Sequence, residues 1–170
     1  AGAVGLPEDP IADGVVPGLD VLQTLSLGPD LPTRWAGLSL DWEAPRRSAV
    51  DRPELDALGV AALDRDVATL SGGNIQRVFY ARVLAADAQL MVLAYPSRGL
   101  DIATVRVGLD LVRERCEEGC GVLMVSEDID ELLAVCDRIV VLHDGQVSGD
   151  VIAARTDRTA VGELMVGAAA

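Results

Sequence analysis

Residues 70–101 read LSGGNIQRVFYARVLAADAQLMVLAYPSRGLD, and this stretch decides the fold. Ser71 stands where a helix would begin, and Gly72 and Gly73 follow it. The first turn of a helix leaves backbone N–H groups without intrahelical acceptors, and the helix dipole adds partial positive charge there. Glycines let an anion approach these groups, and the serine hydroxyl is one more donor. The pattern predicts an anion site such as a phosphate site, although a glycine-rich helix cap without any ligand has the same pattern.

The rest of the chain after this stretch has the alternation of a parallel α/β fold. Short apolar runs, as in strands covered on both faces, lie at residues 90–93, 121–125 and 138–142. Amphipathic helical patterns separate them, over residues 105–116 and 129–136. This order predicts a parallel sheet with right-handed crossovers. The Asp144–Gly145 pair predicts that the sheet ends in an antiparallel hairpin.

Residues 1–69 differ in composition from the rest of the chain. They contain seven of the eight prolines and both tryptophans. We expect short helices joined by loops here, with helices over residues 21–27 and 53–63. The segment 28–48 has three prolines and the paired Arg46 and Arg47, which favours an exposed connection.

Composition limits the possible functions. The 170 residues are 50% hydrophobic, which is typical of one globular domain. The net charge of −13 repels phosphate backbones, so we expect no nucleic-acid partner. Three cysteines without a C-x-x-C pair indicate free thiols and no metal site. The sequence does not start with Met, so we expect it to begin inside a longer chain.

The basic residues exclude one kind of phosphate site. All fourteen are arginines, and the sequence contains no lysine. A phosphate-binding P-loop has the pattern G-x4-G-K-[ST], in which the lysine contacts the β- and γ-phosphates. The chain therefore contains no such loop.

The order of motifs resembles the ATP-binding cassette (ABC) ATPases. LSGGNIQR is followed by PSRGLD, VSEDIDE and DRIVVLHDG. With LPEDPIADGVVPGLDVLQTLSL near the start and VGELMVG near the end, the chain looks like the C-terminal part of the second cassette of tandem simple-sugar and nucleoside importer ATPases. This implies a partial P-loop NTPase core with parallel strands and a terminal antiparallel hairpin, plus an α-helical subdomain. Residues 1–88 would hold a Q-loop-like segment and the subdomain ending in the signature helix, and 89–170 the C-terminal part of the core, with no Walker A part.

The resemblance also implies which residues meet ATP. In that family the signature reaches across a head-to-tail dimer to the γ-phosphate of ATP held by the other cassette. The residues that bind ATP in trans would then be Ser71, Gly72, Gly73, Asn74 and Gln76. Leu100 and Asp101 would form a D-loop at the same interface, and Glu8 would be Q-loop-like.

By the same resemblance the catalytic positions are not intact. Ala94 and Tyr95 stand where the family has Asp-Glu, and Glu127 stands where it has a histidine. Alanine has no side-chain oxygen for Mg²⁺, and tyrosine is a weak general base at neutral pH. ATP and Mg²⁺ would therefore be held mainly by the partner cassette, and we expect this chain alone to be inactive.

The function implied is coupling of ATP binding and hydrolysis to import of a small solute, a sugar or nucleoside, at the cytoplasmic face of the cell membrane. The partners would be the first cassette of the same protein, membrane permease subunits and, indirectly, a solute-binding protein. We expect the permease to dock on the proline-rich segment before Leu70, and the isolated chain to be marginally stable. Two alternatives remain: a non-catalytic truncated cassette acting as a regulatory or interaction protein, and an ABC ATPase of DNA repair or translation, which the acidity disfavours.

Overall fold

A computed structural model describes residues 2–28, 34–36 and 39–167. The chain forms two compact units, residues 1–123 and 124–170, where its length indicated one domain. The division at residues 88 and 89 follows family motifs rather than compactness, and it stays a prediction. Over the ranges described, no helix has both the length and the apolar character needed to cross a membrane.

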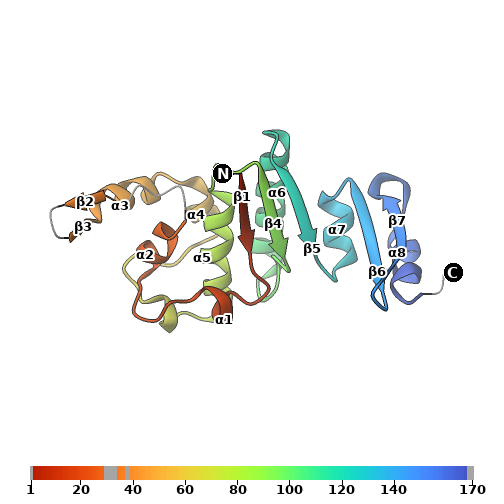
Figure 1. Cartoon of the computed structure of the whole chain (residues 1–170), viewed down its shortest axis with the longest axis horizontal. Helices are drawn as coiled ribbons and strands as arrows, with labels where there is room; N and C mark the ends of the chain where they lie inside the picture. The colour runs from red at the N-terminus through yellow and green to blue at the C-terminus, as the bar shows by residue number, and fades with distance from the viewer. Residues whose placement is uncertain (1, 29–33, 37–38, 168–170) are drawn as a thin grey trace. The chain divides into compact units, whose positions relative to one another are not determined.

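The first unit is built on a three-stranded sheet with the order β1-β4-β5. Its strands are β1 (Ala3–Leu6), β4 (Leu90–Ala94) and β5 (Gly121–Val125). β1 and β4 are parallel, and the three arrows point the same way in Figure 1. This confirms the parallel sheet, and it brings the carboxyl ends of the strands to one edge, where α/β folds place their ligands.

Helix α5 (Gly72–Leu84) is the centre of the first unit. Val78, Phe79 and Tyr80 are at most 1% exposed, so the middle of this helix is fully enclosed. It contacts β1, α6 (Ile102–Glu117) and three short helices, which are α1 (Pro10–Gly14), α2 (Val21–Ser26) and α4 (Pro53–Ala57). A short 3-10 helix over Val67–Thr69 leads into α5. The signature segment therefore starts a helix whose position is fixed by its own core.

The region before α4 is more ordered than the sequence indicated. β2 (Arg34–Ala36) and β3 (Ser39–Asp41) pair antiparallel, and α3 (Glu43–Val50) follows. The prediction that 28–48 is an exposed connection is therefore wrong where the segment is described; residues 29–33 and 37–38 lie outside the description. Pro45 did not prevent the helix, because a proline in the first turn removes no helical hydrogen bond.

The two helices expected in the N-terminal region have different outcomes. The helix expected over residues 21–27 is confirmed as α2, which Asp20 begins with a capping box. The helix expected over 53–63 stops at Ala57, because Gly59 adopts a φ of +62° and ends it.

The second unit is a hairpin covered on one face by helices. β6 (Arg138–His143) and β7 (Gln146–Ile152) pair antiparallel through Asp144 and Gly145, which have φ of 47° and 75° as a type I′ turn requires. The predicted hairpin is confirmed, but in the described residues it forms a two-stranded sheet of its own, so the prediction that it ends the parallel sheet is wrong. Its core is Ile139, Val141, Ala153 and Val161, and the apolar stripe of α7 (Ile129–Val135) packs on it. A 3-10 turn (Ala153–Arg155) and α8 (Arg158–Met165) complete the unit.

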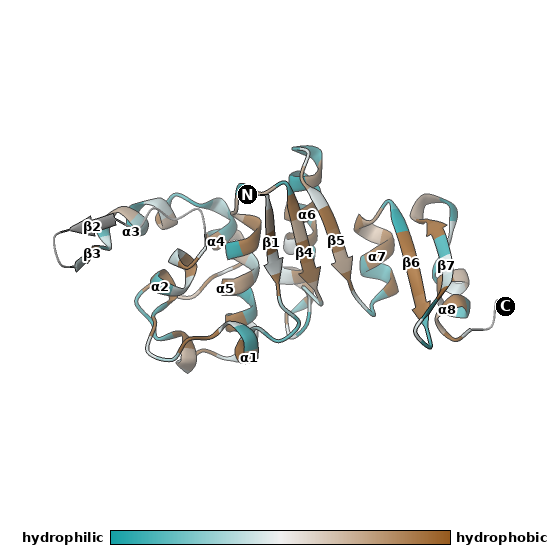
Figure 2. Cartoon of the chain, in the orientation of Figure 1, coloured by the Kyte–Doolittle hydropathy of each residue, from teal (hydrophilic) through white to brown (hydrophobic). Residues whose placement is uncertain are grey.

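The strands are less covered than their apolar sequences indicated. Leu123 of β5 is 57% exposed, and Leu142 of β6 is 69% exposed. Figure 2 shows hydrophobic colour along β4, β5 and β6. Strands of this composition normally have both faces buried, so the expectation of two covered faces is wrong for β5 and β6. Their open apolar surface supports the prediction of marginal stability, which remains to be tested.

Candidate functional site

The start of α5 presents a set of hydrogen-bond donors. Ser71 is the N-cap, and its Oγ accepts from the Asn74 N–H at 3.4 Å. A hydroxyl that accepts here still has its own proton to donate. The N–H groups of Gly72 and Gly73 belong to the first turn and have no intrahelical acceptor. Ser71 and Gly72 are exposed, so this end of a 13-residue helix meets the predicted requirement for an anion.

The two glycines of the signature do different things. A Cβ added to Gly72 would meet only the Ile11 Cδ1 atom at 3.7 Å, an ordinary contact. A Cβ added to Gly73 would lie 2.7 Å from the carbonyl oxygen of Gly99. Gly72 therefore keeps the helix start open to an approaching group. Gly73 instead allows close packing inside the chain.

Gly99 belongs to the β4–α6 loop, which we define as residues 95–101, and α5 holds this loop in place. Gln76 is 5% exposed, and its Nε2 donates to the carbonyls of Tyr95 (3.3 Å) and Pro96 (3.0 Å). The Arg77 guanidinium bonds the Asp101 carboxylate at 2.6 Å. Gly73, Gln76 and Arg77 are spaced i, i+3 and i+4, so one side of the helix carries all three contacts. The structure thus places Gln76 inside, against the loop, while Ser71 and Gly72 face outward.

Asp101 is fully engaged within the chain. It caps α6, and it accepts from the Thr104 hydroxyl at 2.7 Å and the Thr104 N–H at 3.0 Å. These bonds, with a smaller effect of Arg77, lower the pKa of Asp101 to about 2. Leu100 beside it is half-buried. Of the two D-loop candidates, Asp101 therefore directs its carboxylate at its own helix.

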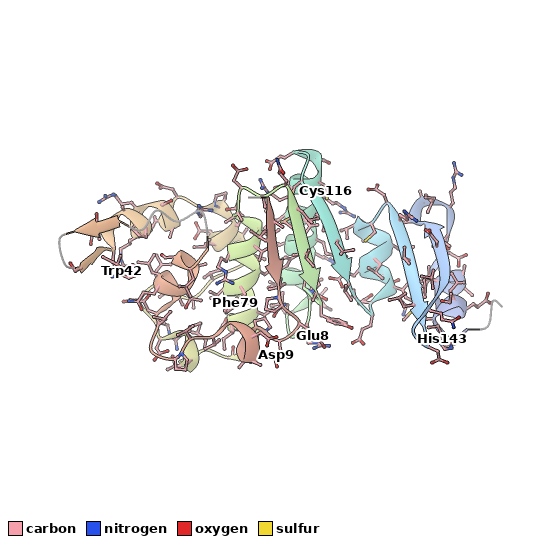
Figure 3. All side chains as sticks on the ribbon, viewed as in Figure 1. Glu8, Asp9, Trp42, Phe79, Cys116 and His143 are labelled. Carbon is pink, nitrogen blue, oxygen red and sulfur yellow. The ribbon has the colours of Figure 1, made fainter. Side chains whose placement is uncertain are left out.

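The carboxyl end of β4 has a different chemistry. Tyr95 has a φ of 49°, in the left-handed region, and the Arg98 guanidinium lies 4.4 Å from the centre of its ring. Arg98 also pairs with Glu8 at 3.3 Å, and Figure 3 shows Glu8 near this end of β4. The parallel pairing of β1 and β4 thus joins two predicted positions that are far apart in sequence. Both partners of the ion pair are more than half exposed, so its contribution to stability is small.

These residues do not fit Mg²⁺. Ala94 contributes no side-chain oxygen at the strand end, and Mg²⁺ binding relies on carboxylate oxygens. Throughout the described residues, no three His, Cys, Asp or Glu side chains gather as a metal site. In the second unit, Glu127 is exposed after β5, and the buried carboxylate nearby is that of Glu131, which accepts from the Ser126 hydroxyl at 2.5 Å.

Sequence reasoning missed Arg77, Arg98 and Thr104. Arg77 lies four residues after Gly73, and that helical spacing could have placed both on one side of α5. For Arg98 no comparable signal exists, because its partner Glu8 is ninety residues away in the chain.

No family model matches the chain, but individual proteins do. Ribose import ATP-binding protein RbsA of Roseobacter denitrificans is 36% identical over 150 residues, which are 88% of this chain and 29% of that protein. The RbsA protein of Jannaschia sp. is 38% identical over 149 residues, again 88% of this chain and 29% of the relative. That of Corynebacterium glutamicum is 33% identical over 161 residues, 95% of this chain and 30% of the relative. The chain thus spans about three tenths of the length of these curated relatives.

Solved structures share the fold. A dimeric ATP-binding cassette in a post-hydrolysis state with ADP and phosphate superposes with a TM-score of 0.70 at 23% identity, covering 89% of this chain and 63% of the cassette. An ATP-binding subunit of an ABC transporter gives a TM-score of 0.72 at 24% identity, covering 88% of this chain and 58% of the subunit. These coverages show the partial cassette core that the sequence predicted. Sequence similarity and fold agree: the chain has the fold of the ATP-binding cassette ATPases, and over most of its length it is similar in sequence to ribose import ATP-binding proteins.

Proposed function

We propose that this chain is the C-terminal part of a cassette in a tandem importer ATPase, and that it donates the start of α5 to an ATP held by another cassette. One observation carries the proposal. The chain has an exposed set of donors at Ser71 and Gly72, but no lysine from which to build a P-loop of its own. A phosphate at these donors must then be held chiefly by another polypeptide segment.

The chemistry supports a role in binding the γ-phosphate. The Ser71 hydroxyl and the Gly72 and Gly73 N–H groups would bond its oxygens, and each bond to a charged group contributes about 1.5 to 3 kcal/mol. The helix dipole favours the same negative charge. These contacts orient the phosphate and stabilise the charge that develops as it is transferred. They require that the α5 start and the P-loop of the other cassette close on the same ATP.

The end of β4 would not contribute to hydrolysis. Ala94 offers no ligand to Mg²⁺, and the Tyr95 ring lies under Arg98. Mg²⁺, where ATP carries it, would be coordinated by the partner cassette and the phosphates. We therefore assign hydrolysis to a site completed by this chain rather than one contained in it.

The relatives support a proposal for the transported solute and the partners. Proteins named for ribose import share about a third of the chain's residues, which supports a small sugar as the cargo of the whole protein, with nucleosides as the second class. A membrane permease would receive the mechanical work, and a solute-binding protein would deliver the cargo to it. The chain would act as a peripheral part at the cytoplasmic face of the membrane.

The decisive experiment replaces Ser71 by arginine in the full-length protein that carries this chain. The long side chain would block the α5 start, so we expect ATP hydrolysis and transport to fall to background. Tyr95→Phe serves as the matched control in the same cassette, because it keeps the ring under Arg98; we expect activity close to that of the unmodified protein. Full transport by the Ser71→Arg protein would contradict the proposal.

A non-catalytic interaction protein is the second candidate, favoured by the replaced carboxylates at Ala94 and Tyr95. On that account the chain would bind a partner without completing an ATP site. It predicts that Ser71→Arg changes neither hydrolysis nor the affinity for the partner, so the same experiment separates the two functions.

A further inference from the structure

The strongest unexplained feature is the polar network under the signature. Arg77 donates to three acceptors on two helices: Asp101 at 2.6 Å, Thr104 Oγ1 at 3.1 Å and Asn74 Oδ1 at 3.4 Å. Asn74 lies in the first turn of α5, while Asp101 and Thr104 form the start of α6. One guanidinium therefore joins the two helix starts that the proposed function places at the cassette interface.

The Arg77 side chain is 26% exposed, against 63% for Arg138 in its pair with Asp150 and 66% for Arg158 in its pair with Asp130. Arg115 is 22% exposed, but its partner Glu118 is only three residues away, whereas Arg77 and Asp101 join two different helices. Within the described residues, the Nε of Arg77, like that of Arg115, is buried without a hydrogen-bond partner. A buried donor without an acceptor is unfavourable. The buried Nε gives Arg77 no stabilising bond, so we explain the position of Arg77 by the contacts of its terminal nitrogens.

Two further contacts make the connection rigid. Gly73 packs against the Gly99 carbonyl so closely that a Cβ would lie 2.7 Å from it, and Gln76 binds the carbonyls of Tyr95 and Pro96. The β4–α6 loop is thus fastened to α5 at both of its ends and in its middle. Displacing the loop would displace the start of α5 as well.

We propose that Arg77 is a positioning residue that couples the Ser71–Gly73 donors to the β4–α6 loop, so that a partner cassette meets both as one body. This inference rests on the proposed function. When the partner cassette contacts and shifts the β4–α6 loop, the Arg77 contacts shift the Ser71–Gly73 donors with it. These donors contact the γ-phosphate only when the interface is closed. Arg77 itself does not touch the nucleotide. Its effect is on the geometry of the closed state rather than on ATP affinity.

The test measures ATP hydrolysis by the full-length protein. Arg77→Met keeps the length of the side chain and removes its charge, whereas Asp101→Asn keeps a good helix cap and removes the charge of the partner. For each we expect kcat to fall roughly ten- to a hundredfold, the effect of a misplaced group. We expect KM for ATP to change by less than about threefold, because the P-loop that grips ATP lies elsewhere.

Four further measurements make the result specific. The double variant Arg77→Met/Asp101→Asn should be no slower than the slower single variant, since both remove one connection. Arg77→Lys should recover part of kcat, and the remote control Arg138→Met should match the unmodified protein. Hydrogen exchange should increase in residues 95–104 of Arg77→Met.

The inference is overturned if folded Asp101→Asn keeps its kcat while Ser71→Arg is inactive, and in that case the proposed function still stands. The inference is also overturned if the fold-decreases in kcat of the two single variants multiply in the double variant. If Ser71→Arg is itself fully active, the proposed function fails, and the coupling has no role to explain.

Discussion

The start of α5 and the end of β4 lie in the same unit and touch through Gln76, yet they have opposite chemistry. At the start of α5, the serine, both glycines and their supporting contacts are all present. The end of β4 has an alanine and a tyrosine where the family resemblance predicts carboxylates, and an arginine lies over the tyrosine ring. Under the proposed function, the difference separates two tasks, donating phosphate contacts to a partner and hydrolysing bound ATP. The chain would then carry the parts for the first task only.

The largest effect expected from this contrast concerns ATP affinity. Without a lysine, the 170-residue chain cannot form a P-loop, and the α5 donors are the phosphate contacts that we propose for it. We expect it to bind ATP more weakly than about 1 mM, which corresponds to less than about 4 kcal/mol of binding free energy. Isothermal titration with MgATP checks this. A micromolar Kd would show a complete nucleotide site and would remove the contrast between the two regions.

The two glycines give the next largest effect. Gly73→Ala forces a Cβ against the Gly99 carbonyl, and such overpacking typically lowers the free energy of unfolding by about 1 to 3 kcal/mol. Gly72→Ala has room, and an alanine in a helix raises stability by up to about 1 kcal/mol. Denaturant unfolding of both variants measures the difference. In the full-length protein we expect Gly72→Ala to lower ATPase activity despite its stability, because the methyl group obstructs the phosphate.

Equal stability of the two glycine variants would contradict this assignment of roles. It would mean that the loop can move away from α5 without loss, and the coupling through Arg77 would lose its structural basis as well.

The titration of Asp101 tests which residues hold α5 and α6 together. Its pKa of about 2 lies below the ordinary 3.8, so its carboxylate stabilises the fold above pH 3.8, and this contribution is lost as the pH falls through about 2. Thr104→Val should raise the pKa of Asp101 more than Arg77→Met, because the bond from the Thr104 hydroxyl is the largest cause of the lowered pKa. NMR titration of the Asp101 carboxyl carbon measures both shifts, and the reverse order would show that Arg77 dominates.

The smallest effect is expected at the end of β4. Tyr95→Phe keeps the ring under Arg98, so the free energy of unfolding should change by less than about 0.5 kcal/mol. Arg98→Met removes an exposed cation–π contact and an exposed ion pair, and it should lower stability by about 1 kcal/mol at most. Thermal unfolding measures both variants. A loss of several kcal/mol would make this region a structural centre rather than a replaced active site.

Much of the fold could be predicted because local patterns and tertiary structure agree. The apolar runs 90–93 and 121–125 and the Asp144–Gly145 turn signal predict two strands and a hairpin, and the structure has these elements at those positions. The prediction for residues 28–48 is wrong because prolines favour a loop in general, whereas Pro45 stands in the first turn of α3, where a proline is tolerated. The absence of a P-loop could be predicted from composition alone, because the sequence contains no lysine.

The site could be predicted in part for a similar reason. Ser71 and Gly72 show their role locally, in the sequence of a helix start. Gln76 and Asp101 were assigned from family resemblance, and only the structure shows that both side chains face their own chain. The pairing of Glu8 with Arg98 joins residues on two strand ends. No local sequence pattern contains such a contact.

The most direct test of the central claim uses the full-length protein and an ATP analogue with a photoreactive group on its γ-phosphate. After illumination, the labelled peptides are identified by mass spectrometry. The account predicts label on the peptide that contains residues 70–77, and its loss in the Ser71→Arg variant. Label confined to other peptides, with residues 70–77 unmodified while ATP is being hydrolysed, would contradict it.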